Sequence, residues 1–129
     1  MLAARRRRGS IAVEFSLTLP ILITTALSVG EVGFHLSERQ RFVQATFEAA
    51  RYASSGPDAP SNTQVFTHTV YVLDEMGLDP DGLQLIINRG YDGAEPVVTV
   101  TMSLPTTVLW GTVTIPDAHS QQFTFVQRS

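Results

Sequence analysis

The chain has 129 residues, enough for one modest domain, and its formal net charge is −3. It contains no lysine, and Arg5 to Arg8 supply four of the nine positive charges, so beyond residue 9 five arginines face twelve acidic residues. This acidic remainder excludes the lasting basic surface that a nucleic-acid partner requires. The absence of cysteine excludes disulfides, thiolate metal sites and a cysteine nucleophile.

An apolar run follows the arginines. Ile11 to Gly30 carries only one charge, Glu14. As a helix this run would span roughly 30 Å, which is about the thickness of the hydrocarbon core of a bilayer. Arginines beside such a run stay on the cytoplasmic side. The pattern therefore predicts a single membrane span with a cytoplasmic N-terminus.

Three interpretations of this region compete. As a secretory signal peptide, the arginines form the basic region and Ala26-Leu27-Ser28 offers a cleavage site, but Glu14 interrupts the apolar part. As a permanent anchor, the run is explained and Glu14 is a tolerated interfacial charge. If the region is a prepilin segment, its basic leader ends at Gly9 and a glutamate follows five residues later. Only the third interpretation accounts for every one of these features.

The apolar pattern continues past the membrane span without a break. An apolar stripe at helical spacing is formed by Val32, Leu36, Val43, Phe47 and Ala50. We therefore expect one helix from Ser10 to about Ser54, with a transmembrane and assembly part at 10–33 and an amphipathic extension at 34–54. Pro20 removes one backbone hydrogen bond and predicts a kink in this helix.

The breaker-rich linker Ser54 to Pro60 must end the long helix, and residues 55–129 form a small second domain. Ser61 is predicted to cap a short helix that ends at Gly77. Four strands are then predicted, at Leu83 to Arg89, Val97 to Leu104, Thr112 to Ile115 and Gln121 to Gln127. A longer loop is expected to join the first two strands. The alternation in the second strand places Val98, Val100, Met102 and Leu104 on one apolar face. Trp110 is either a subunit contact or part of the core, and core or membrane-proximal packing is the favoured interpretation. The fold class is α+β, a long helix packed on a short helix and a three- or four-stranded antiparallel sheet.

We find no pattern that indicates catalysis, a metal or a cofactor. His35, His68 and His119 are far apart in sequence and lack the spacing of metal ligands. Asp79 to Gly82 superficially resembles a calcium loop, but Asn88 would stand where the bidentate glutamate is required, so a polar turn is the better interpretation.

Two stretches carry a resemblance to a known family. From Gly9 to Pro20 the order is a cleavable glycine, small residues, Val13-Glu14-Phe15, an apolar run and a proline. This order resembles the TadE-like family of pseudopilins, which belong to Tad (tight adherence, type IVc) pilus systems. Glu48 to Ala53 is similar to a second stretch of that family, at the end of its long helix.

The resemblance implies that a prepilin peptidase cuts between Gly9 and Ser10 and removes the leader, residues 1–9, with Arg5, Arg6, Arg7 and Arg8. Glu14 would then neutralise the new ammonium group of Ser10 in a neighbouring subunit, and Phe15 would belong to the same assembly segment. The chain would be a minor pilin, not an enzyme, with a pilin-like fold.

The implied partners are prepilin peptidase, TadF-like subunits, the major Flp-type pilin, the inner-membrane assembly platform and membrane lipid. The implied location is the bacterial inner membrane, with the C-terminal domain in the periplasm, or in the extracellular pilus after assembly. The alternative is an unprocessed single-pass inner-membrane protein with a periplasmic interaction domain.

Overall fold

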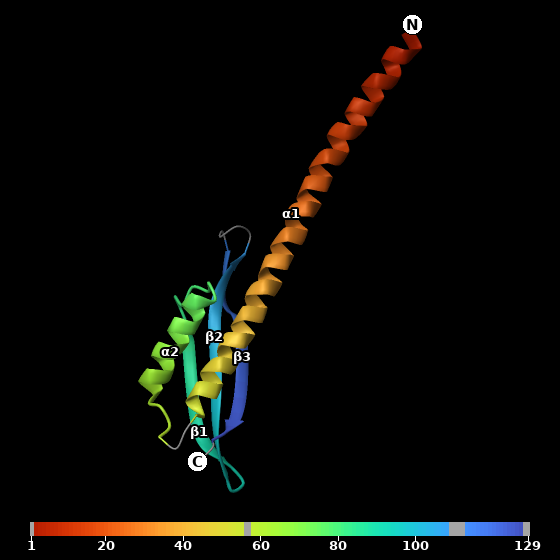
Figure 1. Cartoon of the computed structure of the whole chain (residues 1–129). Helices are drawn as coiled ribbons and strands as arrows, with labels where there is room; N and C mark the ends of the chain where they lie inside the picture. Colours follow the sequence, from red (N-terminus) through yellow and green to blue (C-terminus); the bar gives the residue numbers. More distant parts are fainter. Residues whose placement is uncertain (1, 56–57, 109–112, 128–129) are drawn as a thin grey trace. The chain divides into compact units, whose positions relative to one another are not determined.

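The computed structural model describes the backbone of residues 2–55, 58–108 and 113–127, and their side chains except those of 2–10, 108 and 116–118. Trp110 lies outside these residues. The elements in chain order are α1 (Leu2–Ala53), α2 (Asn62–Glu75), β1 (Gln84–Asp92), β2 (Glu95–Val108) and β3 (Val113–Val126) (Figure 1). The fold is α+β, as predicted. The chain divides into two compact units, Met1–Ser37 and Glu38–Ser129, which are described separately below.

Helix α1 ends where the sequence predicts. Its last residue is Ala53, and Ser54 makes one more backbone bond, to the carbonyl of Ala50 at 3.1 Å. The helix runs through Pro20 without interruption. Proline lacks the backbone N–H that would bond the carbonyl of Ser16. The chain is nevertheless helical on both sides of Pro20.

Both ends of α2 follow from its sequence. Ser61 and Gln64 form a capping box, in which each side chain bonds the backbone N–H of the other residue. At the other end Gly77 adopts a left-handed φ of 71°. This lets Gly77 and Leu78 donate to the carbonyls of Asp74 and Leu73, both at 2.9 Å. The predicted cap at Ser61 and the predicted end at Gly77 are confirmed.

The sheet contains three strands among the described residues, antiparallel and in the order β1-β2-β3. The first hairpin is tighter than the longer loop expected from the sequence. Pairing extends to Asp92 opposite Glu95, which leaves Gly93 and Ala94 alone in the turn. A two-residue turn needs a left-handed residue, and Gly93 supplies it with a φ of 64°.

The last two predicted strands are in fact one. Strand β3 is continuous, and its register with β2 shifts between Leu104, which pairs with His119, and Thr106, which pairs with Ile115. Pro105 lies at this shift, and proline cannot donate a ladder hydrogen bond. The residues between Ile115 and His119, which interrupt the strand pattern in the sequence, therefore lie at this irregularity, and β3 pairs with β2 both before and after it.

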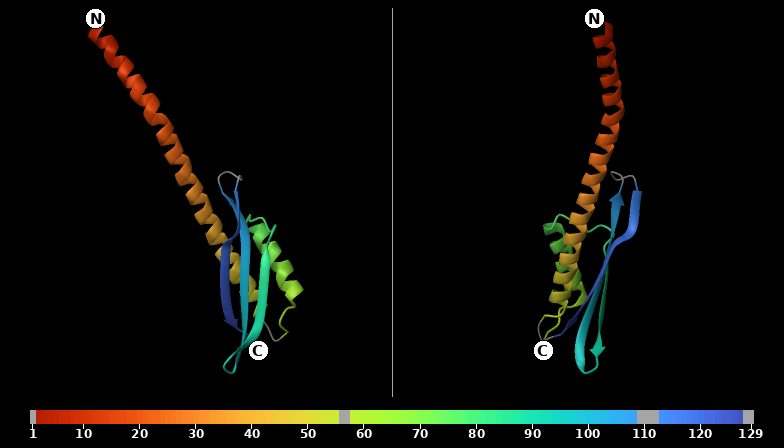
Figure 2. Two further views of the ribbon diagram at one scale, coloured as in Figure 1. Left: turned by 180° about the vertical axis from the view of Figure 1, so that it is seen from behind. Right: turned by 90° about the vertical axis from the view of Figure 1, so that its right-hand side faces the viewer.

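The core of the second unit lies between the sheet and the two helices. Figure 2 shows α2 and the C-terminal part of α1 on the same side of the sheet. The inward face of β2 is the predicted one, since Val98, Val100, Met102 and Leu104 are all buried. Two clusters form: one includes Phe42, Leu73 and Met102, and the other Ala49, Val65 and Val100.

The predicted stripe on α1 was partly wrong. Val32, Leu36 and Phe47 are exposed, whereas the face that is buried carries Phe42, Ala45, Thr46, Ala49, Ala50 and Ala53. The helical period was right, but the stripe is rotated. Alanines occupy most of the buried positions because they let the helix lie close to β2 and α2 in a tightly packed core.

Candidate functional site

The first candidate site is the N-terminal part of α1, in the first unit. Among the described residues, one helical stretch is long and apolar enough to cross a membrane, Ile11–Ala53. Its most apolar window has a mean hydropathy of 1.7, and none of that window is buried within the chain. Ile11 and Phe15 are more than three-fifths exposed. So much exposed apolar surface requires lipid or another protein around it.

The hydroxyl groups of this segment are satisfied by the helix itself. Every serine and threonine between residues 11 and 30 donates to the carbonyl four residues earlier, at 2.8 to 3.0 Å: Ser16 to Ala12, Thr18 to Glu14, Thr24 to Pro20, Thr25 to Ile21 and Ser28 to Thr24. A hydroxyl left without a partner in hydrocarbon would cost several kcal/mol. These bonds make the segment compatible with an apolar environment despite its five hydroxyls.

Glu14 is exposed on this segment. Ser10 and Glu14 are four residues apart, so they lie on one face of the helix about 6 Å apart along its axis. Phe15 is the next residue, 62% exposed. Glu14 is the only acidic residue of the apolar run, which makes it the one counter-charge the run offers to a cation.

The predicted cleavage site lies within regular secondary structure. The backbone of Gly9 and Ser10 belongs to α1, which begins at Leu2. A peptidase needs its scissile bond extended, so cleavage at this site would require the helix to open. Glycine favours such opening, because it stabilises a helix about 1 kcal/mol less than alanine does. The side chains of Arg5, Arg6, Arg7 and Arg8 lie outside the described ones.

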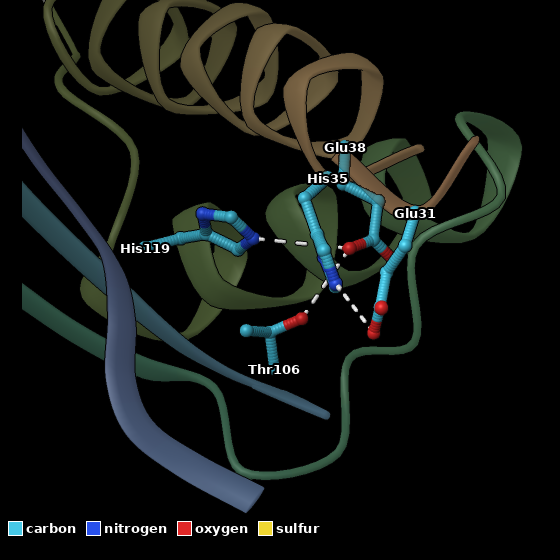
Figure 3. Close-up of polar contacts among 5 residues, drawn as sticks. All are labelled: Glu31, His35, Glu38, Thr106 and His119. Carbon is cyan, nitrogen blue, oxygen red and sulfur yellow. Dashed lines mark hydrogen bonds and ion pairs between the residues drawn. The ribbon is translucent and has the colours of Figure 1, made fainter. Parts of the chain in front are cut away.

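The second unit contains a polar cluster that the sequence did not predict (Figure 3). Glu38 from α1 accepts a hydrogen bond from Thr106 of β2 at 3.3 Å. Its carboxylate also lies 4.0 Å from Nε2 of His119 in β3. His119 is only 8% exposed, and its ring packs on Phe42 with a centroid separation of 5.5 Å. The cluster thus joins one helix and two strands.

A cavity of about 200 Å³ adjoins this cluster and is also lined by Asp79 and Asp81. The two aspartates belong to the predicted polar turn, in which the N–H of Asp81 donates to Oδ1 of Asp79 at 3.0 Å. Within the described residues, no group of three or more acidic or histidine side chains is arranged to hold a metal ion. The contacts of Glu38 tie α1 to β2 and β3.

Figure 3 also shows a separate pair on the first unit, where Nε2 of His35 lies 3.9 Å from a carboxylate oxygen of Glu31 one turn earlier. The i, i+4 spacing of Glu31 and His35 on the predicted helix could have signalled the first pair, whereas the spacing of Glu38 and His119 could not have signalled theirs. The second forms only when residues 81 positions apart meet, and no short pattern signals that.

Residues 9–51 match the family model of TadE-like proteins. Over this segment the sequence is similar to that family. The TadE-like segment covers about a third of the chain, begins at Gly9 and reaches the last turn of α1. It contains Gly9, Ser10, Glu14, Phe15 and Pro20, whereas the four leader arginines precede it. No curated protein matches the chain, and no solved structure does.

Proposed function

We propose that this protein is a minor pilin, or pseudopilin, of a Tad-type pilus, cut by prepilin peptidase after Gly9, and that it helps to initiate or assemble the pilus for surface adherence. The observation that carries the proposal is the TadE-like match, which begins at the glycine of the proposed cut. The exposed apolar helix that follows supports it.

The leader arginines give the proposal its topology. Four adjacent positive charges before an apolar helix hold the N-terminus at the cytoplasmic face of the inner membrane. The second unit then lies in the periplasm, where it can contact other pilus subunits. Removing residues 1–9 releases the helix from this electrostatic anchor, so the subunit can leave the bilayer.

Glu14 provides the assembly chemistry. Cleavage leaves an ammonium group on Ser10 at the start of an apolar rod, and burying an unpaired charge in a subunit interface costs several kcal/mol. A carboxylate of a neighbouring subunit at the same level removes that cost and sets the axial register. Phe15 adds apolar contact area beside the charge pair.

The alternative role is an unprocessed single-pass protein with a periplasmic interaction domain. The continuity of α1 through Gly9 and Ser10 favours it, because a helical backbone resists cleavage. The two roles differ in whether pilus formation in the cell depends on cleavage after Gly9.

A complementation experiment tests the proposal. A strain lacking this protein is supplied with the wild-type chain or with Gly9→Val, whose β-branched side chain obstructs backbone approach at the cut. Surface pili and adherence should return with wild type and not with Gly9→Val. Gly30→Val is the matched control on the same helix, since a side chain at Gly30 has nothing within 4 Å to meet. Full function of Gly9→Val would favour the unprocessed protein.

A further inference from the structure

The second unit has an open groove between the end of α1 and the exposed side of α2, with a volume of about 460 Å³. It is lined by Tyr52, Thr63, Gln64, Thr67, His68 and Tyr71. None of these residues is an acid, a lysine or an arginine. Neither the TadE-like match nor the proposed pilus role assigns this groove a purpose.

Aromatic rings form one wall of the groove. The rings of Tyr52 and His68 are stacked, with centroids 4.2 Å apart and planes 25° from parallel. Tyr52 is also packed against the core cluster behind it, so the pair is held in place. Tyr71, one helical turn beyond His68, is 63% exposed and extends the aromatic surface. An exposed tyrosine beside a fixed ring pair presents a platform that loses little entropy when a ligand binds.

The polar groups of the groove are oriented by bonds within the chain. Oε1 of Gln64 accepts from the N–H of Ser61 at 2.8 Å, so the amide NH₂ of Gln64 remains a donor. The hydroxyl of Thr67 donates to the carbonyl of Thr63 at 2.9 Å, so its oxygen remains an acceptor. Residues 64 and 67 are neighbours on one helix face. The rim thus offers a donor on Gln64 and an acceptor on Thr67.

We propose that this groove binds a neutral oligosaccharide. A sugar ring has an apolar C–H face that stacks on aromatic rings, and its neighbouring hydroxyls both donate and accept hydrogen bonds, which matches the groove on each count. The lack of acids and strong bases on the walls favours an uncharged ligand. A proline-rich peptide also binds aromatic grooves, but its prolines cannot donate to the acceptor at Thr67.

The test uses the full chain in phospholipid nanodiscs, so that no sugar-based detergent competes. Maltohexaose, cellohexaose and mannohexaose are titrated by NMR at concentrations up to the millimolar range, with decaproline as the competing class of ligand. At least one hexasaccharide should bind. Tyr71→Ala should weaken that binding about tenfold or more, because it removes a stacking surface, and Thr67→Val should weaken it by a smaller factor.

Phe66→Ala is the matched control, because Phe66 is a half-exposed aromatic residue on the same helix outside the groove. It should leave the affinity unchanged. The proposal is overturned if none of the three hexasaccharides binds, if only decaproline binds, or if Tyr71→Ala binds as tightly as wild type. Pilus formation is a separate readout, so failure here leaves the proposed pilus function standing.

Discussion

The guanidinium group of Arg89 lies 2.6 Å from the carbonyl oxygen of Pro60. Its other terminal nitrogen donates to the carbonyl of Ala53, the last residue of α1, at 3.3 Å. One side chain of β1 therefore holds both the end of the long helix and the segment that leads into α2.

We expect Arg89→Gln to lower the free energy of unfolding of the second unit by about 1 kcal/mol, because it removes two charge-assisted bonds at an exposed site. Thermal unfolding of the full chain in micelles measures the change. Arg51→Gln is the control, since the side chain of Arg51 forms an exposed ion pair with Glu48 at 3.4 Å. Equal effects of the two substitutions would show that Arg89 has no special role.

Three glycines should respond to alanine in a definite order. Gly90→Ala should be nearly neutral, because nothing lies within 4 Å of the added Cβ. Gly77→Ala should lower the free energy of unfolding by about 1–2 kcal/mol. Its positive φ alone is the cause, because the added Cβ would lie 3.7 Å from its nearest neighbour, which is an ordinary contact. Gly82→Ala should cost most, because its φ is +80° and the Cβ would meet Pro105 at 2.8 Å. Denaturant midpoints of the three variants check the order, and any other order contradicts these backbone assignments.

Phe42 should be the most sensitive position of α1. It is fully buried against the sheet, so Phe42→Ala should cost about 3–5 kcal/mol of unfolding free energy. Phe34→Ala is the control, because Phe34 lies on the same helix and is 58% exposed. It should change the unfolding free energy of the second unit by less than about 1 kcal/mol. If both substitutions destabilise the second unit equally, the buried face of α1 has been assigned wrongly.

The sequence predicted those features of the fold that depend on local chemistry. Ser61 and Gly77 mark the ends of α2 because caps are decided by neighbouring residues. The alternation from Val98 to Leu104 predicted the buried face of β2. When the core covers only one side of a sheet, each strand must turn its apolar face to that side.

Features that depend on tertiary packing were missed. The buried face of α1 carries alanines, which an apolar-stripe criterion weights less than the exposed Leu36. The continuity of β3 depends on pairing with β2 on both sides of a register shift. The Glu38–His119 contact and the Tyr52–His68 stack each join separate elements, so no local pattern could signal them.

Glu14→Gln should separate processing from assembly. The substitution preserves the shape of the side chain and removes the charge, so we expect cleavage to continue while pilus formation falls about tenfold or more. Glu31→Gln on the same helix is the control and should leave pilus formation unchanged. Immunoblots report cleavage and electron microscopy reports pili. Normal pili with Glu14→Gln would rule out the counter-charge role.

The mass of the protein recovered from cell membranes tests the central claim most directly. We predict a mature chain that begins at Ser10 and lacks the nine residues of the leader, and a full-length chain when prepilin peptidase is absent. A membrane protein that retains Arg5 to Arg8 in the presence of an active peptidase would contradict the account.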